Sequence, residues 1–247
     1  MTADKEYALV SKMLQDNGGC RLPCWWGFTP GETSWQTVQT FFASLGKRIE
    51  TWSVDNVQNY TVYFDIPDHQ HYHREFYSVK GGAVEMISIG TVPPVDEDGH
   101  PAYGDPQFAE DWRAYMLPQI LGVYGQPSQV VLGVSRDTPW LPFDLLLFYP
   151  EKGILVQYSG PAENREWETF RVCPHGVEIT LYLWMPEQDT TLADIPGIGS
   201  YTYTTDEMSG LRSLEEATGL SIEQFYQTFS QPDNQTCLET PADLWGG

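Results

Sequence analysis

A strand–turn–strand signal runs from Phe143-Asp-Leu-Leu-Leu-Phe-Tyr149 through the turn Pro150-Glu-Lys-Gly153 to Ile154-Leu-Val-Gln-Tyr158. Two apolar runs of strand length, joined by a short segment that contains Pro and Gly, are typical of a β-hairpin. The first run is too apolar to leave one of its faces in water. This part of the chain therefore predicts antiparallel strands within a core that is covered on both sides.

The order of elements around this hairpin occurs twice along the chain. A helix at 108–124, kinked at Pro118, precedes the hairpin, and an earlier helix begins after Thr33 or Ser34 and ends at Gly46. Strand-like runs follow each helix, at 60–66, 72–79 and 84–89 in the first case and at 130–132, 143–149, 153–158 and 177–184 in the second. The repeat predicts an α+β protein of two helix-plus-antiparallel-sheet units.

These elements divide the chain into four parts. We expect residues 1–90 to hold an N-terminal helix and the first unit, and residues 108–188 to hold the second unit. Residues 91–107 are rich in Pro, Gly and acidic residues and form a connector. Residues 189–247 form a helical tail that a disulfide pins. Because units of this size are marginal alone, we expect the two to pack together.

The four cysteines indicate disulfides. An even number of cysteines, in a chain rich in Trp, Gly and Pro, is typical of disulfides rather than of a metal site or a catalytic thiol. Four cysteines allow three pairings. We expect Cys20 to pair with Cys24, since Pro23 favours a bend between them, and Cys173 to pair with Cys237 and anchor the tail.

Disulfides indicate an extracytoplasmic location, but the first residues contain no apolar segment of signal-peptide length. Either the protein is cytosolic with free thiols, or the sequence is a mature form with an added Met; we favour the second reading. The protein would then be secreted or held at the cell surface, with a signal peptide or a lipid-anchored leader in its precursor. No apolar run is long enough to span a membrane.

Charge restricts the partners. The chain has 13 basic and 34 acidic residues, which give a net charge of −21. A surface this negative repels nucleic acid, because phosphate binding requires Lys and Arg. An unknown protein or a neutral ligand such as a sugar is the expected partner. No Gly-rich phosphate loop is present, and we expect no cofactor.

Four segments of the chain form recognisable motifs: Cys-x-Leu-Pro-Cys-Trp-Trp-Gly-x-x-Pro-Gly-x-Thr at 20–33, Leu-Phe-Tyr-Pro-Glu-Lys-Gly-Ile at 147–154, Val-Cys-Pro at 172–174 and Cys-Leu-x-Thr-Pro at 237–241. Together they resemble an uncharacterised family of bacterial secreted proteins and lipoproteins. The resemblance covers most of the chain, implies an extracytoplasmic compartment and carries no known activity. In architecture alone, the chain is also similar to tandem helix-plus-sheet inhibitor proteins and outer-membrane assembly lipoproteins, which bind other proteins.

Three histidines are the sharpest candidates for chemistry. If the segment is extended, His69, His71 and His73 project to one face, as alternating metal ligands would. Three imidazoles on one strand cannot all reach one ion without strain, so two of them with Glu75, Asp65 or His100 would form a better ligand set. We favour the other reading, an exposed hairpin whose polar residues face water. We therefore expect no tightly bound metal here.

Tryptophans suggest a ligand face. Of the nine, Trp140 and Trp167 lie in loop-like segments, where a ring beside carboxylates suits a sugar; the alternative is that the rings fill the core. A glycosidase needs two facing carboxylates, and 34 acidic residues satisfy any spacing, so no catalytic residue is predicted. We expect a non-enzymatic binding or interaction module, with a secreted carbohydrate-active hydrolase that uses Asp or Glu as the alternative.

Overall fold

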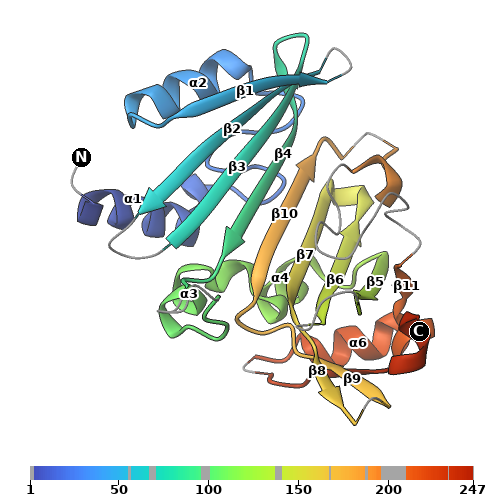
Figure 1. The fold of residues 1–247 in the computed structure, drawn as a ribbon. Coiled ribbons are helices and arrows are strands. Elements are labelled where there is room, and N and C mark those ends of the chain that lie inside the picture. Colours follow the sequence, from blue (N-terminus) through green and yellow to red (C-terminus); the bar gives the residue numbers. More distant parts are fainter. Residues whose placement is uncertain are drawn as a thin grey trace. The chain divides into compact units, whose positions relative to one another are not determined.

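The computed structural model describes residues 3–54, 57–66, 71–95, 101–136, 141–166, 168–186, 189–195, 210–232 and 234–246. It confirms the predicted α+β class, with antiparallel sheets and helices near the C-terminus (Figure 1). The chain forms two compact units. The first comprises Met1–Trp112, Pro150–Leu155 and Thr180–Asp189, and the second comprises Arg113–Tyr149, Val156–Ile179 and Thr190–Gly247.

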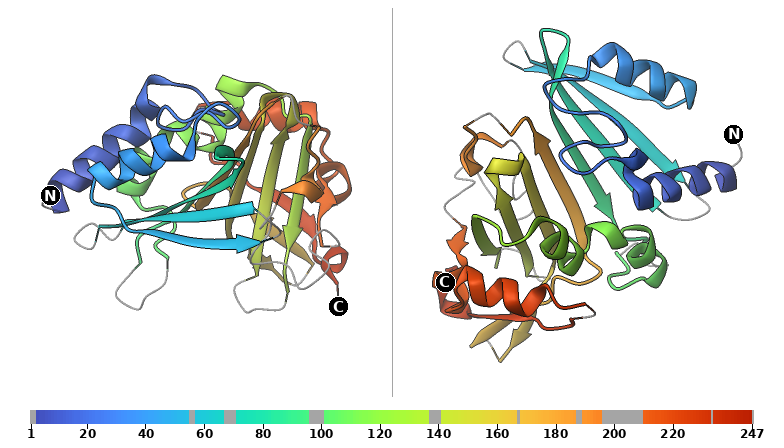
Figure 2. Two further views of the ribbon diagram at one scale, coloured as in Figure 1. Left: turned by 90° about the horizontal axis from the view of Figure 1, so that it is seen from above. Right: turned by 180° about the vertical axis from the view of Figure 1, so that it is seen from behind.

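The first unit is a sheet with helices on one of its faces (Figure 2). Its helices are α1 (Ala3–Asp16), α2 (Trp35–Ser44) and α3 (Pro106–Asp111). Its sheet begins with β1 (Ile49–Val54), β2 (Val57–Ile66), β3 (His71–Lys80) and β4 (Ala83–Val92), in that order, and Thr180–Trp184 of β10 (Glu178–Trp184) follows β4. Helix α2 begins where expected, because the Ser34 side chain accepts a hydrogen bond from the N–H of Thr37.

Strand alternation decides which side chains of this sheet meet the helices. Residues directly opposite one another in antiparallel strands share a face. Tyr60 faces Tyr77 on the inner side, where Trp35 of α2 stacks on Tyr60 with ring centroids 3.8 Å apart. Phe64 also lies on the inner side and packs against Phe42 of α2. These contacts make the inner face the core of the first unit.

The second unit contains two sheets and several short helices. Its larger sheet has the order β7 (Ile154–Pro161, from Val156 onward), β6 (Pro142–Tyr149), β5 (Gln129–Val134) and β11 (Arg212–Ser213). The smaller sheet has the order β12 (Leu238–Pro241), β9 (Thr169–Val172) and β8 (Glu163–Arg165). Its helices are η3 (Arg113–Tyr115), α4 (Leu117–Tyr124), α5 (Leu214–Thr218) and α6 (Ile222–Phe229). Short 3-10 turns η1 (Asn17–Gly19), η4 (Pro150–Lys152), η5 (Leu192–Asp194) and η6 (Ala242–Trp245) complete the two units.

The prediction of one kinked helix at 108–124 is wrong. The helix α3 ends at Asp111, the turn η3 follows, and α4 begins at Leu117. Pro118 therefore lies in the first turn of a new helix, where its missing N–H has no intrahelical partner to lose. Within the described residues, no helix is both long and apolar enough to cross a membrane.

Gly153 closes the predicted turn and cannot be replaced without a clash. Its φ is +65°, and a Cβ atom there would lie 2.1 Å from the carbonyl oxygen of Trp184. We expect Gly153→Ala to lower the free energy of unfolding by about 2–3 kcal/mol, from backbone strain plus overpacking. Gly46→Ala is the matched control, because Gly46 has φ +69° but a Cβ atom added there would meet nothing within 4 Å. Urea unfolding measures both variants, and equal losses would contradict the steric argument.

Candidate functional site

A hook formed by residues 20–28 covers the inner face of the first sheet. Asn17, just before it, holds its backbone: the side-chain amide donates to the carbonyl oxygens of Cys20 and Cys24 at 3.1 and 2.8 Å. The Asn17 side-chain oxygen accepts from the N–H of Trp26 at 2.9 Å. The predicted Cys20–Cys24 disulfide is present and closes the hook. These bonds fix the two indole rings of Trp25 and Trp26, which stack on each other.

Glu75 lies beneath the hook as a fully buried carboxylate. Its Oε1 accepts a hydrogen bond from Nε1 of Trp25 at 2.8 Å and lies 2.9 Å from Nε2 of His73. Its Oε2 accepts from the hydroxyl of Tyr77 at 2.5 Å. Burial, reinforced by the Glu75 charge, raises the pKa of the Tyr77 phenol well above its usual value, so this hydroxyl stays protonated and donates. The network ties the hook to β3.

Of the three candidate histidines, only His73 has a described side chain, and it is not exposed as the hairpin reading expected. Its side chain is buried, and its ring is surrounded by Phe64, Trp112, Trp26 and Trp25, with centroids 5.0 to 6.2 Å away. His69 lies outside the described residues, and nothing is described of the His71 side chain. Across the described ranges, no group of three or more His, Cys, Asp or Glu is arranged to hold a metal ion.

Two further buried carboxylates belong to separate networks. Asp111 accepts from the hydroxyls of Tyr7 and Ser11, each at 2.7 Å. In the second unit, Asp144 accepts from the side-chain amide of Gln157 at 2.7 Å and from the hydroxyl of Ser159. Burial, followed by the hydrogen bond to Asp111, raises the pKa of the Tyr7 phenol. These carboxylates bind internal donors and are nearly or fully inaccessible to solvent, an arrangement that holds structure together.

The opposite face of the first sheet carries a different set of side chains. We call the outward side chains of β1–β3 the open face, because α1 and α2 both lie on the other side of these strands (Figure 2). Its described members, assigned from the strand register, are Glu50, Trp52, Val57, Asn59, Thr61, Tyr63, Arg74, Phe76, Ser78 and Lys80. Thr61, in the middle of this face, is only 2% exposed.

Aromatic rings and hydrogen-bonding groups alternate across the open face. Trp52, on the edge strand β1, is 42% exposed and meets Phe76 in a T-shaped contact with centroids 6.2 Å apart. Asn59 lies opposite Trp52, and its side-chain oxygen accepts from the hydroxyl of Ser78 at 2.8 Å. The exposed Trp52 ring can make apolar contacts with a ligand, and the neighbouring amide and hydroxyl can form hydrogen bonds with it.

A second polar group lies next to Trp52. The hydroxyl of Tyr63 donates to Oε2 of Glu50 at 2.7 Å, and Arg48 pairs with Oε1 of Glu50 at 3.1 Å. The Arg48 guanidinium also lies 4.7 Å from the centroid of the Tyr63 ring. The hydrogen bond to Glu50 raises the pKa of the Tyr63 phenol, which keeps this ring neutral. The hydrogen bond, the ion pair and the cation–π contact together hold the side chains of Arg48, Glu50 and Tyr63 in fixed positions.

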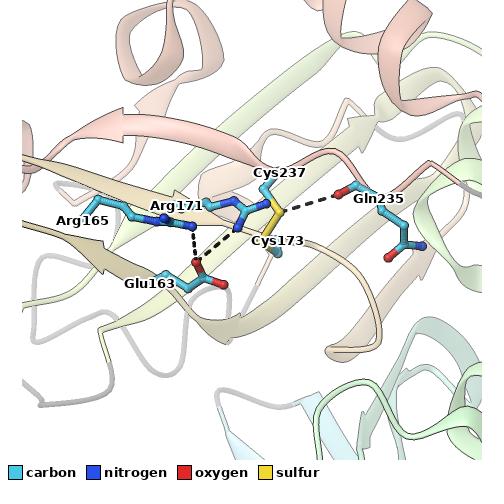
Figure 3. Close-up of polar contacts among 6 residues, drawn as sticks. All are labelled: Glu163, Arg165, Arg171, Cys173, Gln235 and Cys237. Carbon is cyan, nitrogen blue, oxygen red and sulfur yellow. Dashed lines mark hydrogen bonds and ion pairs between the residues drawn. A yellow bond between two sulfur atoms is a disulfide. The ribbon is translucent and has the colours of Figure 1, made fainter.

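The smaller sheet of the second unit presents a charged surface beside the tail disulfide (Figure 3). Arg165 and Arg171 both approach Oε2 of Glu163, at 3.0 and 3.3 Å. The predicted Cys173–Cys237 disulfide joins the residue after β9 to the residue before β12. The ion pair between Arg171 and Glu163 thus joins β9 to β8, and the disulfide fastens the start of β12 to the end of β9.

Comparison with protein-family models, curated proteins and solved structures found no match. The geometry of the described residues therefore carries the functional argument alone. The predicted ligand residues Trp140 and Trp167 lie outside the described residues. The sequence prediction missed Trp52 because Ile-Glu-Thr-Trp-Ser-Val is too polar to stand out as a strand, although its β-branched and aromatic residues were a usable signal.

Proposed function

We propose that the protein is an extracytoplasmic binding module without catalytic activity, and that the open face is its binding surface. The observation that carries the proposal is the exposed Trp52, paired with Phe76 and flanked by the hydrogen-bonding side chains of Asn59 and Ser78. Contiguous exposed apolar surface marks interaction sites, and Trp is enriched among the residues that contribute most to binding.

Two further observations support the proposal. The two disulfides are consistent with an oxidising compartment. The carboxylates Glu75, Asp111 and Asp144 are each occupied by internal donors, whereas a glycosidase requires two carboxyl groups that face each other across a bound sugar. These acidic residues give no support to the alternative of a carbohydrate-active hydrolase.

Replacing Trp52 with alanine tests the proposal. We expect Trp52→Ala to change the free energy of unfolding by less than about 1 kcal/mol, because the ring is partly in water, and to weaken ligand binding at least about tenfold. Binding is measured against defined probes, namely purified soluble polysaccharides and an array of synthetic peptides. Tyr103→Ala is the control, because Tyr103 is a similarly exposed aromatic residue of the first unit that lies outside β1–β3.

Each result has a fixed meaning. A probe that binds the wild type and the Tyr103→Ala variant equally, but Trp52→Ala much more weakly, supports the proposal. Binding that is indifferent to Trp52, or the absence of any bound probe, would refute the open face as the binding surface. Shortening of a bound polysaccharide by wild-type protein would show that the module is an enzyme.

A further inference from the structure

We infer that the ligand of the open face is a neutral polysaccharide, a chain of pyranose sugars without charged substituents. The inference rests on the proposed function, since it names the ligand class of the same surface. Three features of the open face carry it: an aromatic platform, hydrogen-bonding groups at the edge of that platform, and described charged side chains without the acidic excess of the whole chain.

The aromatic platform is the pair formed by Trp52 and Phe76. The planes of the two rings are inclined by 82°. A T-shaped pair uses the edge of one ring and one face of the other, so each ring keeps a face that this contact does not cover. The apolar face of a pyranose, which consists of C–H groups, matches a flat indole in size and polarity. Such a contact suits a sugar without requiring any charge.

The polar groups beside the platform have capacity left for sugar hydroxyls. The Asn59 side-chain nitrogen makes one long bond, 3.4 Å to the carbonyl oxygen of Val57, and its oxygen accepts one bond from Ser78. An amide offers two donors and two acceptor positions, so half of its capacity is open. Glu50 accepts one bond at each oxygen and has further lone pairs. A hydroxyl both donates and accepts, and therefore fits this mixture.

The charge of the open face differs from that of the whole chain. The described charged side chains on this side of β1–β3 are Arg48, Glu50, Arg74 and Lys80; Arg48 is paired with Glu50, and Lys80 lies 3.8 Å from Glu85 of β4. The complete chain, in contrast, has 34 acidic and 13 basic residues. The described side chains of the open face thus show no acidic excess that would attract a basic partner, and the −21 charge of the chain repels an anionic polymer over longer distances. The local charge of the open face and the negative charge of the whole chain together favour a neutral ligand.

The test measures binding of soluble neutral polysaccharides (a β-glucan, a xylan and a mannan) against polygalacturonate as an acidic polymer and chitosan as a basic one. Tryptophan fluorescence and retardation in affinity gels report binding by the folded, oxidised protein. We expect at least one neutral polymer to bind, with an affinity unchanged when salt rises from about 0.05 M to about 0.5 M. Trp52→Ala should weaken it at least about tenfold and Asn59→Ala severalfold, while Tyr103→Ala should not change it.

The other outcomes separate this inference from the proposed function. Peptide binding that depends on Trp52, without any neutral polysaccharide bound, would overturn the inference and leave the binding module intact. Stronger binding to chitosan or polygalacturonate that disappears in high salt would overturn it in the same way. Neutral polysaccharide bound equally by wild type and Trp52→Ala would refute both the inference and the open face as the binding surface.

Discussion

Replacing Glu75 with alanine is expected to lower the free energy of unfolding by about 3–5 kcal/mol, the loss typical of breaking a buried polar pair at one partner. The substitution leaves the Trp25 indole N–H and the Tyr77 hydroxyl buried without their acceptor, and it removes the partner of His73. It also leaves a cavity below the hook. Glu75→Gln should cost less, because its side-chain oxygen still accepts one of these hydrogen bonds.

Urea unfolding followed by tryptophan fluorescence measures the effect. Glu85→Ala is the matched control, because Glu85 lies on the neighbouring strand β4 with its side chain 38% exposed and 3.8 Å from Lys80. An exposed pair of this kind contributes about 0.5 kcal/mol or less. Similar losses in Glu75→Ala and Glu85→Ala would show that the buried network does not hold the hook on the sheet.

Removing the tail disulfide is expected to lower the free energy of unfolding by about 4 kcal/mol. Cys173 and Cys237 are 64 residues apart, so their cross-link removes much of the conformational entropy of the unfolded chain. We also expect the double variant Cys173→Ser/Cys237→Ser to weaken the pairing of β12 with β9, because the disulfide adjoins this strand pair (Figure 3).

The second disulfide supplies the control. Cys20 and Cys24 are only four residues apart, and the same entropy relation gives about 2 kcal/mol for their cross-link. The variant Cys20→Ser/Cys24→Ser should thus be the more stable of the two in denaturant unfolding. Equal losses, or a larger loss at Cys20–Cys24, would indicate that native contacts near the hook outweigh chain entropy. Labelling of denatured, unreduced wild-type protein should find almost no free thiol.

Features encoded by neighbouring residues were predictable from the sequence. Ser34 caps α2 because a serine side chain reaches the N–H three residues on, whatever the rest of the chain does. Gly153 turns the chain with positive φ, as the Pro-Glu-Lys-Gly signal indicates. The pairing of the cysteines followed from their spacing and from the need to hold the tail, and both disulfides are present.

Short strands that depend on a distant partner were not predictable. The strand β12 consists of four residues and exists because it pairs with β9, nearly seventy residues earlier, in a register from Leu238 opposite Val172 to Pro241 opposite Thr169. No local pattern contains such a partner. β1 was missed for a different reason: its residues are polar enough to pass for a loop, although its partner β2 is the next strand along the chain.

The sequence by itself determined the class of the fold, the helix caps, the main strands and the cysteine pairs. Tertiary structure alone decided which face of β3 became core and which became the open face. Alternation puts His73, Glu75 and Tyr77 on one side and Arg74, Phe76 and Ser78 on the other. The polar residues His73 and Glu75 became the buried ones because Trp25, fifty residues before Glu75, supplies a hydrogen bond and covering rings. A strand specifies two faces, and only the segments that pack on it decide which of them is kept from water.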